Sequence, residues 1–135
     1  MKPPRNHDKL RILIVDDSDF NRRSMAEILT NEGYNVAGQA GSAEDAIQIA
    51  HSSKANLIFI DVVMPDISGL ELTKHFQEKH TGERFIIMMS SLNIDSIVIE
   101  SISNGAIDFL QKPFECDDLL KAVEKIERLV VKDSH

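Results

Sequence analysis

The sequence has little cysteine and no cluster of positive charge. Its one cysteine, Cys116, excludes an internal disulfide framework and a zinc site built from cysteines, so we expect it to be a packing or surface residue. Lysine and arginine together number 15 against 22 acidic residues, which leaves a net charge of −7. Affinity for nucleic acid comes from clustered positive charge, so no nucleic acid partner is expected. The low cysteine content favours the reducing cytoplasm.

Long apolar runs are also missing. No segment approaches the roughly 20 apolar residues that cross a bilayer, and the polar residues 1–9 lack the apolar stretch of a signal peptide. The chain of 135 residues is long enough for one buried core and too short for two ordinary domains. We therefore expect a soluble protein without a membrane partner, with a flexible lead-in at 1–9, one domain at 10–131 and a short tail at 132–135.

Short apolar runs alternate with amphipathic segments along the rest of the chain. The run RILIV ends abruptly in Asp16, Asp17 and Ser18, which is typical of a buried strand followed by a helix cap. The same cycle recurs four more times, which indicates an α/β fold: a doubly wound parallel sheet of five strands with helices on both faces. Strands are predicted at 11–15, 34–40, 56–60, 84–89 and 107–111, and helices at 20–29, 42–51, 68–80, 93–103 and 116–131.

Polar residues follow four of these five strands. In a parallel sheet the carboxyl ends of all strands lie at one edge, and ligands bind in the crevice there. Asp16 and Asp17 follow the first strand, and Asp61 follows the third. Ser90 follows the fourth strand and Lys112 the fifth. If these strands are neighbours, three carboxylates, one hydroxyl and one ammonium converge.

Three carboxylates in one crevice need a compensating cation. Mg²⁺ prefers oxygen ligands and is commonly held by one or two carboxylates, waters and phosphate oxygens. Together with Lys112, one Mg²⁺ would bring the site close to neutrality and leave one carboxylate able to attack phosphorus. Mg²⁺, Lys112 and the Ser90 hydroxyl could then bind the oxygens of the new phosphoryl group.

Each of these residues also has a purely structural interpretation. Asp16, Asp17 and Ser18 alone fit a turn and a helix cap. Ser90 fits a cap of the fourth helix, and Asp61 and Lys112 fit ordinary loop residues. Their joint placement at four strand ends favours the functional interpretation.

Four segments of the chain resemble the receiver domain of bacterial response regulators. These segments are VDDS at 15–18, DVVMPDISG at 61–69, MSS at 89–91 and NGAIDFLQKPF at 104–114. The resemblance extends over almost the whole chain, from about residue 10 to residue 131. It implies a CheY-like, flavodoxin-like fold with strand order 2-1-3-4-5. It also implies that a sensor histidine kinase or a phosphotransfer protein supplies a phosphoryl group.

The resemblance implies a role for each acidic residue. Asp61 would be the phosphoacceptor. Asp17 and Asp61 would bind Mg²⁺ directly, together with the backbone carbonyl of Val63, and Asp16 would assist through water.

The resemblance also implies a phosphoryl-binding pair and a switch. Ser90 and Lys112 would bind the phosphoryl oxygens, and the peptide bond from Lys112 to Pro113 would be cis. Ser90 would then move toward the phosphoryl group while the aromatic Phe109 turns inward. This movement would remodel the surface formed by the fourth helix, fifth strand and fifth helix. Phe109 could instead be only a core or half-exposed ring.

Val63 and Leu92 occupy the positions that flank the path of the hydrolytic water in this family. Neither side chain can orient water, so we expect slow autodephosphorylation. They could also simply pack together without setting the rate.

The predicted fourth helix carries more apolar residues than one sheet face can bury. We expect some of them to be exposed and propose a homodimer or effector contact through Ile94 and Ile97. Single exposed aliphatic residues are also normal on protein surfaces.

We therefore expect a single-domain response regulator that assists its own phosphorylation and dephosphorylation but is not an enzyme with a separate substrate. No output segment follows residue 131, which favours output through protein contact, in a chemotaxis-like or phosphorelay shuttle role. A hydrolase with an aspartyl-phosphate intermediate is disfavoured, because its motif has a second Asp where this chain has Val63. A phosphorylation-independent pseudo-receiver and a receiver cut from a longer regulator remain alternatives.

Overall fold

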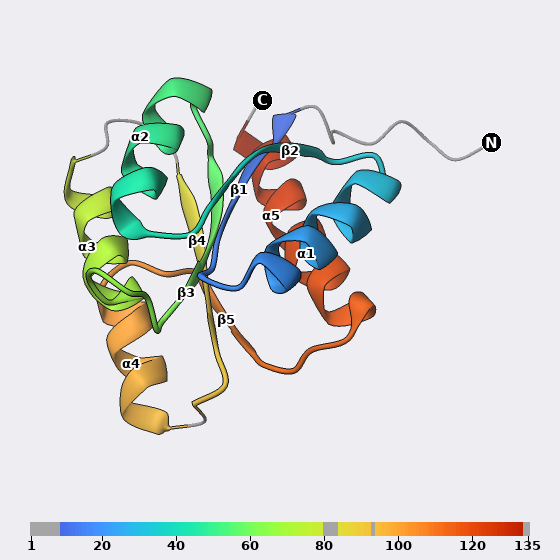
Figure 1. The fold of residues 1–135 in the computed structure, drawn as a ribbon. Coiled ribbons are helices and arrows are strands. Elements are labelled where there is room, and N and C mark those ends of the chain that lie inside the picture. Colours follow the sequence, from blue (N-terminus) through green and yellow to red (C-terminus); the bar gives the residue numbers. More distant parts are fainter. Residues whose placement is uncertain (1–8, 80–83, 93, 134–135) are drawn as a thin grey trace.

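Five parallel strands form one sheet between two layers of helices (Figure 1). The computed structural model describes residues 9–79, 84–92 and 94–133. The strands lie in the order β2-β1-β3-β4-β5, which confirms the predicted fold class and strand order. The strands are β1 (Arg11–Val15), β2 (Asn35–Ala40), β3 (Leu57–Asp61), β4 (Phe85–Ser90) and β5 (Asp108–Gln111). The helices are α1 (Asp19–Asn31), α2 (Ala43–Ser53), α3 (Gly69–Lys79), α4 (Asp95–Ser103) and α5 (Cys116–Asp133).

The predicted elements are all present, with small differences at their ends. Helix α1 runs to Asn31, past the predicted end at residue 29, and the chain then turns at Gly33, whose φ of 90° is easy only for glycine. Several predicted boundaries lie outside the described residues. These are the lead-in at 1–8, the helix end at residue 80, the helix start at residue 93 and the tail at 134–135.

Serine side chains begin the two helices that follow β1 and β2. The Ser18 hydroxyl accepts a hydrogen bond from the Asn21 N–H, and the Ser42 hydroxyl accepts one from the Asp45 N–H. Each hydroxyl satisfies a backbone donor that has no partner within its helix. The two caps fix where the chain leaves the carboxyl ends of β1 and β2.

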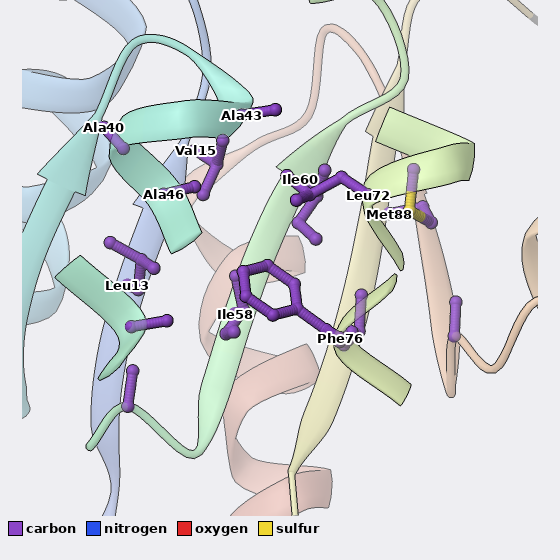
Figure 2. Close-up of a cluster of buried hydrophobic side chains, with 14 of the residues drawn as sticks. Leu13, Val15, Ala40, Ala43, Ala46, Ile58, Ile60, Leu72, Phe76 and Met88 are labelled. Atoms are coloured by element: carbon purple, nitrogen blue, oxygen red, sulfur yellow. The ribbon is translucent and has the colours of Figure 1, made fainter. Parts of the chain in front are cut away.

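The core lies on both faces of the sheet because the central strands are buried on both sides. Leu13 and Val15 of β1 face α2 and α3, in the cluster drawn in Figure 2. Ile12 and Ile14 of the same strand belong to the opposite cluster, which α1 and α5 cover. Figure 1 shows this division, with α2, α3 and α4 on one face and α1 and α5 on the other. This two-sided burial explains why β1 and β3 are apolar without alternation.

Helix α4 leaves much of its apolar surface uncovered. Ile94, which directly precedes the helix, is 49% exposed, and Ile99 and Ile102 within it are 65% and 50% exposed, which confirms the predicted excess of apolar residues here. Ile97 is half-buried and packs against the core, so it offers less surface for a partner than predicted. Ile97 is half-buried because α4 must bury some apolar surface against the core to pack on the sheet.

Helix α5 is amphipathic and packs on the sheet through Leu119, Val123 and Ile126. Within the described residues, no helix combines the length and apolar content needed to cross a bilayer.

Candidate functional site

Three carboxylates lie together at the carboxyl edge of the sheet. Asp16 follows β1 directly, Asp17 comes next, and Asp61 is the last residue of β3. One carboxylate oxygen from each lies within 4.8 Å of the others. Asp16 and Asp61 are buried, whereas Asp17 is exposed. Carboxylate oxygens at this spacing fit a hard divalent cation such as Mg²⁺.

Lys112 joins two of these carboxylates. It follows β5, and its Nζ atom lies 2.5 Å from Asp16 Oδ2 and 2.6 Å from Asp61 Oδ2. The strands that carry these residues are not consecutive in the chain, so only the sheet order brings the three groups together. One ammonium thus neutralises part of a site with three negative charges.

The surroundings shift the pKa values of both Asp61 and Lys112. Burial raises the pKa of Asp61 above its usual value, against the opposing hydrogen bond from Lys112. Burial alone would lower the pKa of Lys112, but hydrogen bonds to Asp16 and Asp61 outweigh it and leave the pKa raised. The raised pKa keeps the Lys112 side chain positively charged at neutral pH. A second cation at the cluster would favour the ionised form of Asp61.

Ser90 lies at the same edge of the sheet as the last residue of β4. It is buried, and its hydroxyl accepts a hydrogen bond from the Leu92 N–H at 2.9 Å. The N–H of Lys112 donates to the Ser90 carbonyl at 2.8 Å, which ties the ends of β4 and β5 together. Ser90 thus lies at the same sheet edge as the cluster, and its hydroxyl is hydrogen-bonded to the backbone of the loop that follows β4.

The loop after β3 folds back onto Asp61. The N–H of Val63 donates to Asp61 Oδ1 at 3.0 Å. Val63 is 56% exposed, and Leu92, in the loop after β4, is 39% exposed. Both side chains that were predicted to affect hydrolysis therefore border solvent.

Gly69 has a structural role that the sequence alone did not reveal. A Cβ atom on this residue would lie 2.0 Å from the backbone oxygen of Asp61, and its N–H donates to the Val62 carbonyl at 2.7 Å. Helix α3 can therefore begin against the end of β3 only with glycine here. The available signal was a glycine at a loop-to-helix junction, close in the sequence to the candidate site residues Asp61 and Val63.

Asp66 was also not recognised in the sequence. Its two carboxylate oxygens accept hydrogen bonds from the N–H groups of Ala43 and Glu44, each at 3.0 Å. These hydrogen bonds hold the pKa of Asp66 below its usual value, and the one from the Ala43 N–H has the largest effect. The carboxylate therefore ties the loop after Asp61 to the amino end of α2, where a negative charge is favourable.

Arg22 of α1 holds the loop that carries the first two carboxylates. Its guanidinium donates to the Asp16 carbonyl and to the Asp19 carboxylate. No sequence pattern indicated this contact, because the acceptor at Asp16 is a backbone atom.

Phe109 lies outside the cluster. It is half-buried on β5 and packs against the core cluster beneath α2 and α3. The peptide bond between Lys112 and Pro113 is cis, as predicted. Cys116 is exposed at the start of α5.

Comparisons with known proteins agree with this geometry. The family model of the response regulator receiver domain matches residues 12–124. The chemotaxis protein CheY of Thermotoga maritima is 33% identical over 118 residues, which are 87% of this chain and 98% of that protein.

Solved structures match over similar lengths. A CheY-like receiver domain from Methanospirillum hungatei has a TM-score of 0.85 at 29% identity, covering 92% of this chain and 98% of that chain. A CheY from Borrelia burgdorferi, solved with CheX, BeF3 and Mg²⁺, has a TM-score of 0.82 at 28% identity, covering 90% of this chain and 94% of that chain. The chain therefore belongs to the response regulator receiver domain family of two-component signalling.

Proposed function

We propose that the chain acts as a single-domain response regulator that accepts a phosphoryl group on Asp61. A sensor histidine kinase or a phosphotransfer protein supplies this group from a phosphohistidine, and we place the exchange in the cytoplasm. The observation that carries the proposal is the contact of the Lys112 ammonium with both Asp61 and Asp16, inside a cluster of three carboxylates.

Mg²⁺ is the cation that this set of ligands favours. Asp17 and Asp61 would hold it directly, together with the backbone carbonyl of Val63, and Asp16 would assist through water. Three carboxylates against one ammonium leave a negative site, which supports binding of a divalent ion. When bound, the ion supplies positive charge to the phosphoryl oxygens. The Mg²⁺ present with the CheY of Borrelia burgdorferi supports the choice of this cation.

The chain's own groups perform the transfer. An oxygen of Asp61 attacks the phosphorus, a P–O bond forms as the P–N bond of the donor breaks, and the imidazole leaves with the bonding electron pair. The Lys112 ammonium lies beside the attacking carboxylate and binds the phosphoryl oxygens. The buried Ser90, whose hydroxyl accepts a hydrogen bond from the Leu92 N–H, would turn this hydroxyl toward the same group and donate to it.

This rotation is the first step of the proposed switch. Ser90 leaves Leu92, Phe109 moves further into the core, and the surface of α4, β5 and α5 changes. The exposed Ile94 and Ile102 offer that surface apolar contacts for an effector or a second copy of the chain. Sedimentation velocity with BeF3 and Mg²⁺ tests the homodimer. Association that survives Ile94→Ser with Ile102→Ser would exclude these residues from its interface.

Intact-mass analysis after incubation with acetyl phosphate tests the phosphoacceptor. We expect one phosphoryl adduct on the wild type with Mg²⁺, none with a chelator, and none on Asp61→Asn. Asp118→Asn is a matched control, because this exposed residue lies in the first turn of α5, and it should form the adduct normally. No adduct on the wild type, even with a competent histidine kinase and Mg²⁺, would favour the phosphorylation-independent pseudo-receiver.

The adduct should decay slowly. Val63 and Leu92 have side chains that cannot orient a water molecule, and both border the solvent side of the site. Following the adduct mass with time should show faster decay in Val63→Asn and Leu92→Gln. Unchanged decay in both variants would show that the rate is set elsewhere.

A further inference from the structure

A basic pocket lies at the amino edge of the sheet, at the opposite end of the strands from the acidic cluster. It has a volume of about 300 Å³. Arg11 begins β1, Arg84 directly precedes β4, and His51 and Lys54 belong to the end of α2. Four basic side chains from three separate parts of the chain therefore surround one hollow.

Both arginines are held in place by the backbone. Arg11 Nε donates to the Lys54 carbonyl at 2.8 Å, and Arg84 Nε donates to the Ala55 carbonyl at 3.3 Å. The Arg84 guanidinium also lies 5.0 Å from the ring centre of Phe76. Each bond uses only the Nε atom. Within the described residues, the terminal nitrogens of both guanidinium groups have no hydrogen-bond acceptor.

The pocket holds positive charge that no described carboxylate balances. Arg11, Lys54 and Arg84 contribute three charges, and no acidic residue is among those that line the hollow. The carboxyl end of α2 contributes only about half a negative charge through its dipole. Burial lowers the pKa of Arg84, as expected for a charge that is partly removed from water.

The structural alternative is that these residues only cap the end of α2. Cations near a helix carboxyl end are stabilising, and Lys54 caps α2 in the left-handed conformation with a φ of 56°. Capping accounts for the two Nε bonds. It does not account for the gathering of three basic side chains, Arg11, Lys54 and Arg84, around one hollow in a chain of net charge −7.

We propose that this pocket binds a small organic phosphate. A guanidinium presents paired donors that match two oxygens of a phosphate group, and its bonds to charged acceptors are the strong ones. The volume exceeds that of a phosphate ion alone and reaches the lower end of small-molecule sites. Ala50, Ala55 and Asn56 line the remainder of the wall and leave room for an uncharged organic part. This site is separate from Asp61 and does not depend on phosphoryl transfer.

Amide NMR of the full chain, titrated with inorganic phosphate and with ribose 5-phosphate, tests the proposal. A chelator keeps divalent ions away, and chloride maintains constant ionic strength. We expect saturable shifts at Arg11, Lys54 and Arg84, with ribose 5-phosphate binding more tightly than phosphate. Shifts that chloride reproduces, that fail to saturate, or that occur only around Lys112 would overturn the proposal.

Variants separate binding from capping. Lys54→Gln and Arg11→Gln should each weaken binding about tenfold or more, the usual effect of losing a charged hydrogen bond. Arg84→Lys keeps the charge but loses the paired donors, so it should also bind more weakly. Lys74→Gln on the exposed face of α3 is the matched control for net charge and should bind as the wild type does. If Lys74→Gln weakened binding equally, the loss of affinity would reflect the net charge of the protein and not this pocket, which would overturn the proposal.

Discussion

The two edges of this sheet carry opposite charge and compensate it differently. At the carboxyl edge, Asp16 and Asp61 share one ammonium from Lys112, so a side chain of the chain itself offsets part of the negative charge. At the amino edge, Arg11 and Arg84 are positioned by backbone carbonyls, which carry only partial charge. The first edge is therefore partly compensated by the chain, whereas the second lacks a compensating carboxylate in the described residues. The difference teaches that burial alone does not identify a charged binding site. Whether a buried charge is paired with an opposite charge or only with a backbone carbonyl is the more informative criterion.

The largest effect on this comparison should come from Lys112→Met, which removes the compensation at the carboxyl edge. The side chain of Asp16 is 1% exposed and that of Asp61 11% exposed, so both negative charges would remain buried without the ammonium that opposes them. We expect a loss of about 3 kcal/mol of unfolding free energy near neutral pH, measured with urea. Mg²⁺ should restore part of this loss, because it supplies the missing positive charge.

Lys125→Met is the matched control for that loss. Lys125 lies 3.9 Å from Asp108, and its own side chain is 68% exposed, so no measurable change is expected. If Lys112→Met were no less stable than Lys125→Met, the carboxyl edge would not depend on its ammonium. The contrast between the two edges would then fail.

A smaller but clear loss is expected for Gly69→Ala. The new Cβ would lie 2.0 Å from the Asp61 backbone oxygen, so the start of α3 or the end of β3 must move. We expect a cost of roughly 2–3 kcal/mol in urea unfolding, together with weaker Mg²⁺ binding. Gly41→Ala is the control, because its Cβ would meet only the end of the Arg22 side chain, at 3.1 Å. Equal stability of the two variants would contradict the close approach at Asp61.

The smallest effect should come from Asp66→Ala, and it should depend on pH. Asp66 has a lowered pKa in the folded chain, so its ionised form favours folding. That contribution is fully present above the usual carboxyl pKa and is lost as pH falls through the lowered folded value. The wild type should therefore melt at a slightly higher temperature than Asp66→Ala at pH 7, and the two should converge in acid. A constant difference across this range would show that Asp66 acts through packing and not through its charge.

The sheet could be predicted because its signal is local. Buried strands such as β1 and β3 are continuous apolar runs, and Asp16 and Asp61 mark their ends directly. The sequence could place these acids at one edge because parallel strands share a direction. The order of the strands came from family resemblance, since no local pattern specifies which strands are neighbours.

The parts of the site that escaped prediction depend on distant contacts. Asp66 binds backbone N–H groups 22 and 23 residues earlier in the chain, and backbone donors leave no trace in the sequence. The need for Gly69 appears only when α3 meets the end of β3. The hydrogen bond from the Leu92 N–H to the Ser90 hydroxyl depends on the conformation of the loop after β4, which the serine itself does not determine. Such contacts are decided by tertiary structure.

The most direct test of the central claim is to map the phosphorylated residue. After reaction with acetyl phosphate and Mg²⁺, borohydride reduces an acyl phosphate to an alcohol and converts that aspartate to homoserine, which peptide mass spectrometry locates. We predict homoserine at position 61 alone, because Asp61 contacts Lys112 within the carboxylate cluster and its side chain, 11% exposed against 1% for Asp16, is the more accessible of the two to a phosphodonor. Homoserine at position 16 or 17, or at none of the three, would contradict the account.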